Sequence, residues 1–227
     1  MVNFFDKSKN LEDKKNIAKI GAAHVKDGMT IGLGSGTTMA YFVEAVAERI
    51  KDEKLNVQFI PASKFIEKIA YDYKLKLVSI DQINEIDCAV DGADRIINKK
   101  ILIKGGGGSL FREKKILLNA KNCLILADES KFTDIIDDFI VPVEIVPFGF
   151  TKTVRAIEEM GGYCFIRKNK EKILVTDNQN YIVDVKFSNV NDLVRVHKKL
   201  KLINGVVETG IFYNLEFEFI TSSEKEW

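Results

Sequence analysis

The chain has 227 residues, 46% of them hydrophobic, which is enough to bury a sizeable core in one large domain or two small ones. Its 34 basic and 33 acidic residues nearly cancel, so composition recommends neither nucleic acid nor a membrane as partner, and any anion must be bound by local geometry. Three widely spaced cysteines in apolar segments indicate reduced thiols in a cytoplasmic protein, and we expect neither a disulfide nor a metal site. No apolar run reaches the roughly 20 residues that cross a bilayer, and the first residues lack the pattern of a signal peptide.

Strand-like and helix-like runs alternate along the chain up to about residue 130, a pattern typical of a parallel sheet with crossover helices. The predicted fold class is therefore α/β, with an open, mostly parallel, Rossmann-like sheet. In such sheets, ligands gather at the carboxyl ends of the strands. The predicted helices are residues 10–26, 38–51, 63–73 and 110–121, and the predicted strands are 30–33, 57–60, 75–79, 87–90, 101–103 and 123–127.

The order of elements changes in the second half of the chain, where the pattern predicts β-α-β-β-α-β. This order matches a split βαβ unit, so we expect an inserted α+β ferredoxin-like subdomain at residues 136–210. Residues 1–135 would form the Rossmann-like catalytic domain, completed by 211–227. The elements of the subdomain are predicted at 140–147, 151–160, 163–167, 173–187, 190–202 and 206–213, followed by one more strand at 215–221 that returns to the first domain.

The first chemical motif, GLGSGTT at residues 32–38, follows a strand and opens a helix. Amides at a helix N-terminus attract an anion, and the hydroxyls of Ser35, Thr37 and Thr38 add donors. A dinucleotide fingerprint would need a glycine at position 37, and a Walker A loop would need a Gly-Lys pair before the threonines. We therefore expect this turn, including Gly36, to bind a phosphate monoester, with dinucleotide binding and a purely structural turn as alternatives.

The second motif, Asp91-Gly92-Ala93-Asp94, stands just beyond an apolar strand. Two carboxylates three residues apart at a strand end are expected to face one crevice, where they can hydrogen-bond sugar hydroxyls, move a ring-opening proton or coordinate Mg²⁺. The alternative is an Asx-type turn, which Asp and Gly favour.

The third motif runs from Lys104 to Glu113 and places a cation, four glycine amides and a carboxylate at one apparent helix start. Ser109 is predicted to be the N-cap. At 100° per residue, Glu113 falls on the apolar side of the helix. Burial there would raise the pKa of the carboxyl, which suits a general base, whereas Lys104 and the helix N-terminus would lower it. The alternative is an amphipathic helix whose Glu113 pairs with a lysine, preceded by an ordinary flexible loop.

Seven motifs together give the chain a resemblance to the type A ribose-5-phosphate isomerase family. They occur in family order over nearly the whole chain. The motifs are GLGSGTT, VDGAD, KGGGGSLFREK, ADESK, PVEIVPFG, VTDNQNYIVDV and GVVETGIF. The resemblance implies interconversion of D-ribose 5-phosphate and D-ribulose 5-phosphate through an enediolate, a step of the non-oxidative pentose phosphate pathway. It also implies a small-molecule pentose 5-phosphate as partner, no metal or organic cofactor, and a homodimer or homotetramer.

The resemblance also implies roles for individual residues. Glu113 would be the base that moves a proton between C1 and C2, and Lys104 with the following amides would stabilise the enediolate oxygens. The two aspartates would hold the sugar hydroxyls and help to open the furanose ring. The residues expected to touch substrate are Lys14, Ser35, Gly36, Thr37, Thr38, Asp91, Gly92, Ala93, Asp94, Lys104, Gly105, Gly106, Gly107 and Lys131, with Lys14 and Lys131 on the phosphate.

Three positions depart from the usual family pattern. Arg95 stands where a glutamate is common, Gly108 where the glycine segment commonly ends in alanine, and Phe111 where a smaller residue is usual. None of these changes removes a proposed catalytic group.

Two other functions remain as alternatives. One is a non-catalytic sugar-phosphate sensor, although no basic helix-turn-helix precedes residue 10. The other is an acyl or CoA transferase that uses Glu113 as nucleophile.

Overall fold

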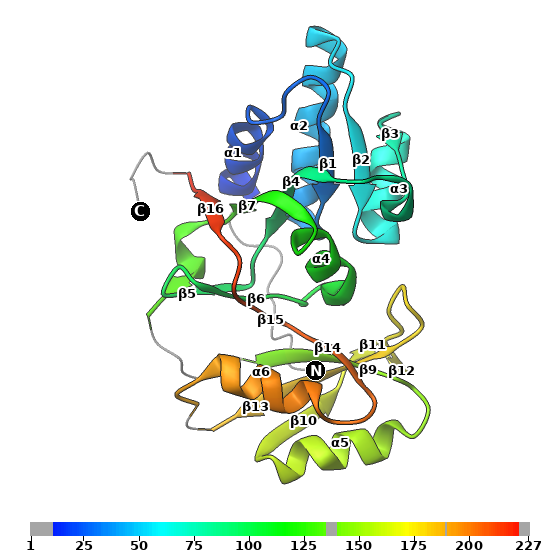
Figure 1. The fold of residues 1–227 in the computed structure, drawn as a ribbon, viewed down its shortest axis with the longest axis vertical. Helices are drawn as coiled ribbons and strands as arrows, with labels where there is room; N and C mark the ends of the chain where they lie inside the picture. The colour runs from blue at the N-terminus through cyan, green and yellow to red at the C-terminus, as the bar shows by residue number, and fades with distance from the viewer. Residues whose placement is uncertain (1–10, 135–139, 189, 223–227) are drawn as a thin grey trace. The chain divides into compact units, whose positions relative to one another are not determined.

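The computed structural model describes residues 11–134, 140–188 and 190–222, and their contacts divide the chain into two units (Figure 1). The parallel-sheet unit contains residues 11–93, 112–132 and 215–222, and the antiparallel unit contains 94–111 and the described part of 133–214. The predicted helix start at residue 10 lies outside the described residues. The predicted domain boundaries at 135/136 and 210/211 stay a prediction.

The parallel-sheet unit is built on six strands in the order β16-β7-β4-β1-β2-β3, and every neighbouring pair is parallel. This confirms the predicted fold class for the first half of the chain. It also confirms that the last strand returns, because β16 pairs with β7. The elements are α1 (Leu11–Ala22), β1 (Thr30–Leu33), α2 (Thr37–Glu53), β2 (Gln58–Pro61), α3 (Lys64–Asp72), β3 (Lys76–Leu77), η1 (Ile80–Gln82), β4 (Ile86–Gly92), β7 (Ala120–Leu126), η2 (Glu129–Lys131) and β16 (Phe217–Ile220).

The two faces of β1 meet different helices. Ile31 and Leu33 are buried in one core cluster with side chains of α1, α2 and α3. Gly32 points to the opposite face, where a Cβ atom would lie only 2.2 Å from Cγ2 of Ile116, on helix α4 (Leu110–Leu117). A glycine at this position therefore lets α4 pack closely on the sheet.

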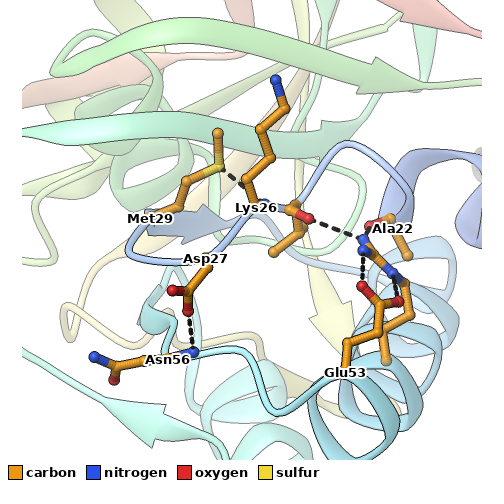
Figure 2. A network of polar contacts seen from close by, with 8 residues as sticks. Ala22, Lys26, Asp27, Met29, Glu53 and Asn56 are labelled. Carbon is orange, nitrogen blue, oxygen red and sulfur yellow. Dashed lines mark hydrogen bonds and ion pairs between the residues drawn. The ribbon is translucent and has the colours of Figure 1, made fainter.

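The C-terminal end of α1 is held by an arginine of α2. The Arg49 guanidinium donates to the carbonyl oxygens of Ala22, the last residue of α1, and of Val25, three residues further on. Glu53, one turn further along α2, accepts from Arg49 at 2.6 and 2.7 Å and keeps the guanidinium in place (Figure 2). The connection between α1 and β1 is thus tied to α2 by side chain to backbone hydrogen bonds.

The antiparallel unit contains a four-stranded sheet in the order β10-β13-β9-β14. Its chain order, β9-α5-β10-β13-α6-β14, is the predicted β-α-β-β-α-β arrangement, and the fold class of the second half is confirmed. The apolar faces of both helices enter one core, represented by Ile157 on α5 and Leu200 on α6. The elements are β9 (Ile140–Ile145), α5 (Phe150–Glu159), β10 (Gly162–Ile166), β11 (Lys168–Asn169), β12 (Lys172–Ile173), β13 (Tyr181–Phe187), α6 (Leu193–Lys201) and β14 (Val206–Thr209).

One predicted strand, residues 101–103, was assigned to the wrong sheet. Residues 101–103 do form the predicted strand, β6 (Ile101–Ile103), but it pairs antiparallel with β5 (Arg95–Ile97) and β15 (Ile211–Phe212), outside the parallel sheet. The full order is β15-β6-β5-β8, with β8 at Phe132–Thr133. The hairpin turn places Asn98 and Lys99 at φ 49° and 53°, and the Lys100 N–H donates to the Ile97 carbonyl. Such turns are usually marked by glycine, so Asn-Lys gave no signal.

Several other elements differ in extent from the prediction: the helix predicted at 10–26 ends at Ala22, and the strand predicted at 173–187 is divided into β12 and β13. Helix α4 ends at Leu117, and the chain pairs with β4 from Ala120 on, so the predicted helix to residue 121 is wrong. Strand pairing outweighs the helical preference of Leu118, Ala120 and Lys121. The strand predicted at 206–213 is divided at Gly210, where the chain passes from one sheet to the other.

None of the helices in the described part of the chain has the length and apolar character that a bilayer crossing requires.

Replacing Gly32 tests the close approach of α4 to the sheet. Gly32→Ala should lower the free energy of unfolding by about 1–3 kcal/mol, because Ile116 is β-branched and has little freedom to move aside. Urea unfolding followed by circular dichroism measures this. Gly107→Ala, whose Cβ would meet nothing within 4 Å, serves as control and should stay within about 1 kcal/mol of the parent. Equal stability of the two variants would contradict this packing.

Candidate active site

The turn between β1 and α2 has the geometry of an anion-binding helix start. Gly36 takes the N-cap position with φ 102° and ψ −177°, a conformation that L side chains rarely adopt. Gly36 offers no side-chain hydrogen bond to cap this helix start, and the first amides of α2, from Thr37 and Thr38 on, lie at the positive end of the helix dipole. The Ser35 hydroxyl is 2.9 Å from that of Ser63, the N-cap of α3.

Asp91 lies against the same turn. It occupies the end of β4, with only 1% of its surface exposed, and its Oδ1 accepts the N–H groups of Gly92 at 2.7 Å and Ser35 at 3.3 Å. A Cβ atom on Gly34 would lie 2.0 Å from both Cγ and Oδ1 of Asp91. The turn and the carboxylate therefore touch, which explains the second glycine of the GLGSGTT motif.

Glu113 is buried on α4, with 5% of its surface exposed. Leu110, Ile116 and Leu117 share this buried side of the helix, whereas Lys115 is exposed. The predicted helical face is thus confirmed. A carboxylate at this depth is shielded from water, and its first-turn position places it near the amides that open the helix.

Lys104 is also buried, with 3% of its surface exposed, and its ammonium nitrogen lies 5.8 Å from the centroid of the Phe212 ring. Its backbone is fixed by Gly210: the Lys104 N–H donates to the Gly210 carbonyl at 2.9 Å, and the Gly210 N–H donates to Pro142 at 2.6 Å. A Cβ atom on Gly210 would lie 2.1 Å from the Lys104 carbonyl oxygen. No residue larger than glycine fits there without moving Lys104.

The glycines after Lys104 form a tight turn in which the Gly108 N–H donates to the Gly105 carbonyl at 3.0 Å. Gly105 and Gly108 have φ values of 112° and 82°, so both need glycine. The Gly106 N–H donates to Asp94 Oδ2 at 2.8 Å, so the structure brings these two predicted residues together.

The remaining predicted residues lie on α1, η2 and β4 and in the turns that follow β4 and β6. Lys14 is buried on α1, with 8% of its surface exposed, and Lys131 ends the short helix η2. Gly92 ends β4, and Ala93 follows it. Gly107 lies inside the glycine turn, and a Cβ atom added to it would meet nothing within 4 Å.

The sequence did not single out three residues that hold the glycine turn. Gly210 fixes Lys104, and Arg167 donates to the Gly105 carbonyl at 2.6 Å while pairing with Asp184. A signal was present for one of them, because Asp184 is a charge within the apolar strand YIVDVKF and a buried charge needs a partner.

The three cysteines are free thiols. Burial is the main cause that raises the pKa values of Cys88 and Cys123 to about 11 and of Cys164 to about 12. Within the described residues, no cluster of three or more His, Cys, Asp or Glu side chains is arranged to hold a metal ion.

A Rossmann-like parallel sheet with a helix-opening glycine turn after its first strand, and a separate ferredoxin-like unit, define the architectural class of this α/β protein. Comparison with known proteins identifies the family within this class. Residues 58–226 match the family model of ribose 5-phosphate isomerase A, also called phosphoriboisomerase A. The chain belongs to the ribose 5-phosphate isomerase A family.

Individual relatives support the same assignment. Ribose-5-phosphate isomerase A 2 of Oceanobacillus iheyensis is 41% identical over 214 residues, which cover 94% of this chain and 96% of that protein. The solved structure of ribose 5-phosphate isomerase A from Methanocaldococcus jannaschii superposes with a TM-score of 0.86 at 39% identity, covering 92% and 94% of the two chains. A D-ribose-5-phosphate isomerase solved in complex with phospho-erythronic acid gives the same TM-score at 32% identity, covering 93% and 96%.

The raised thiol pKa values predict slow alkylation of the native protein. At pH 8, a thiol with a pKa of about 11 has roughly 100-fold less thiolate than one of ordinary pKa. Iodoacetamide followed by mass spectrometry should therefore modify all three cysteines slowly in the native protein and quickly in urea. Rapid labelling of any cysteine in the folded protein at pH 8 would contradict the burial.

The same pKa shifts predict how stability depends on pH. Because unfolding lowers the thiol pKa values, the native state should lose stability as the pH rises from about 9 to about 11.

Proposed function

We propose that this protein interconverts D-ribose 5-phosphate and D-ribulose 5-phosphate through an enediolate, with Glu113 as the general base. Membership of the isomerase family supports the reaction. The observation that carries the mechanism is the burial of Glu113, which is 5% exposed on a helix that follows the Lys104 glycine turn. The protein acts in the cytoplasm as a homodimer or homotetramer and needs no metal or organic cofactor.

The phosphate of the substrate binds at the start of α2. The amides of Gly36, Thr37 and Thr38 and the hydroxyl of Ser35 donate to its oxygens, and Lys131 and Lys14 supply positive charge. The small residues of this turn let the phosphate approach the backbone closely. Phosphate binding then fixes one end of the sugar, which reduces the entropy lost when the carbons are aligned for reaction.

The two aspartates act on the sugar hydroxyls. Asp91 and Asp94 accept hydrogen bonds from them, and one carboxylate moves the proton that opens the furanose ring. The Asp91 carboxylate accepts the N–H groups of Ser35 and Gly92, and the Asp94 carboxylate accepts that of Gly106. The backbone bonds hold both groups in fixed orientations before substrate arrives.

Glu113 carries the proton transfer. It takes the proton from C2 of the open aldose, the C2–H electrons form a C1=C2 double bond, and the C1 carbonyl oxygen becomes negatively charged. The Lys104 ammonium and the glycine amides stabilise this oxygen. A proton passes from O2 to O1, and Glu113 returns its proton to C1, which leaves a ketone at C2. Atoms and charge balance without a redox partner.

Replacing Glu113 tests the base. Glu113→Gln keeps the size of the side chain but cannot take a proton, so kcat should fall by about 10²–10⁴-fold while ribose 5-phosphate still binds. A coupled assay with EDTA present measures ketose formation, and the parent should keep its rate with the chelator. Lys115→Gln, on the exposed side of the same helix, is the matched control and should leave kcat unchanged. Full activity of Glu113→Gln, or loss of parental activity in EDTA, would refute the mechanism.

Replacing Gly34 tests the fixed position of Asp91. The added methyl group of Gly34→Ala would overlap the Asp91 carboxylate, so the carboxylate must move and kcat/KM should fall by about 100-fold. Gly21→Ala is the control, because its added carbon meets only the flexible end of Leu126 in the same unit. Steady-state kinetics should show normal kcat/KM for the control. Normal kcat/KM in Gly34→Ala as well would exclude a role for Asp91 in this position.

A further inference from the structure

Arg167 follows strand β10 in the antiparallel unit and forms a buried ion pair with Asp184 of β13. The side chains are 11% and 6% exposed. Arg167 Nε donates to Asp184 Oδ2 at 2.8 Å and its Nη2 donates to Oδ1, so the pair is bidentate. Two of the five guanidinium donors are thereby fixed, and the plane of the guanidinium is set.

The remaining nitrogen of this guanidinium reaches the glycine turn. Nη1 donates to the Gly105 carbonyl at 2.6 Å and makes a longer contact of 3.4 Å with the Gly106 carbonyl. A buried ion pair is by itself weak evidence for stability, because removing both charges from water is costly. The contacts of Arg167 with two glycine carbonyls indicate that the ion pair orients the glycine turn.

The peptide that joins Gly105 to Gly106 is held at both ends. Its carbonyl accepts from Arg167, and its N–H donates to Asp94 Oδ2 at 2.8 Å. Because a trans peptide is planar, these two bonds fix the rotation of the whole unit. The next peptide has its carbonyl toward Arg167, so the Gly107 N–H is directed to the opposite side.

Glycine residues need such support. They have no side chains to restrict them and lose more conformational freedom on ordering than any other residue. In this turn, Lys104 is fixed by Gly210, and Gly108 donates to Gly105. The two peptides between them take their orientation from Asp94 and Arg167.

We propose that Arg167, held by Asp184, is a positioning residue for the isomerase reaction. It orients the Gly105 and Gly106 carbonyls so that the amides of the turn and Lys104 meet the developing enediolate charge. This inference rests on the proposed function for its catalytic consequence. The bracing of the turn can be measured separately.

Arg167→Lys is the main test, because lysine keeps a positive charge beside Asp184 but cannot donate to the carboxylate in a bidentate manner and to Gly105 at once. We expect kcat to fall about 10- to 100-fold with KM changed less than about threefold. Hydrogen exchange followed by mass spectrometry should become faster in the peptide that covers residues 104–109 and stay unchanged in α5. Arg155→Lys, an exposed arginine of α5 paired with Glu159, is the matched control and should change neither quantity.

The double variant Arg167→Met/Asp184→Asn provides the second test, because it removes both charges and leaves none uncompensated in the interior. It should fold, as judged by circular dichroism, and show the same loss of kcat and the same faster exchange. Unchanged kcat in a folded variant would overturn the proposal, whether or not exchange changes. A parent protein without isomerase activity would instead refute the proposed function, and faster exchange in the variants would still support the bracing of the turn.

Discussion

The hydrogen bonds that hold the glycine turn after Lys104 are the constraint on which the proposed chemistry depends. Donors aimed at a developing oxyanion are effective only if they are oriented beforehand, since reorganising them during the reaction would cost much of the energy they supply. Glycine allows the turn but does not define it. Its definition comes from outside the segment: the Gly210 carbonyl fixes Lys104, Asp94 fixes the Gly106 amide, and Arg167 fixes the Gly105 carbonyl.

The sequence predicted the fold correctly where the hydrophobic periodicity within a segment indicates the secondary structure that the segment adopts. Five of the predicted parallel strands, the returning strand and the β-α-β-β-α-β order are confirmed, because buried strands and amphipathic helices carry their own periodicity. The β5–β6 hairpin was missed because three-residue strands and an Asn98-Lys99 turn give little signal. The end of α4 was misplaced because pairing of Ala120 with Ile86, a long-range contact, decides where the helix stops.

The candidate site likewise has features that local sequence patterns predicted and features that they did not. Helical periodicity correctly predicted the buried face of Glu113, and the glycine pattern correctly predicted a turn that opens α2. The catalytic and binding roles of these residues remain proposals. Arg167 and Gly210 were missed because their importance lies in contacts with residues 62 and 106 positions away in the chain, which no local pattern encodes. Only Asp184, a charge in an apolar strand, could have pointed to this support.

The most direct test of the central claim is isomerisation in D₂O followed by proton NMR. Transfer by Glu113 through an enediolate predicts that solvent deuterium appears at C1 of ribulose 5-phosphate, because the carboxyl proton can exchange before it is returned to carbon. Product formed with no deuterium on carbon, at the same rate by the parent and by Glu113→Gln, would indicate a direct hydride shift. That result would contradict the account.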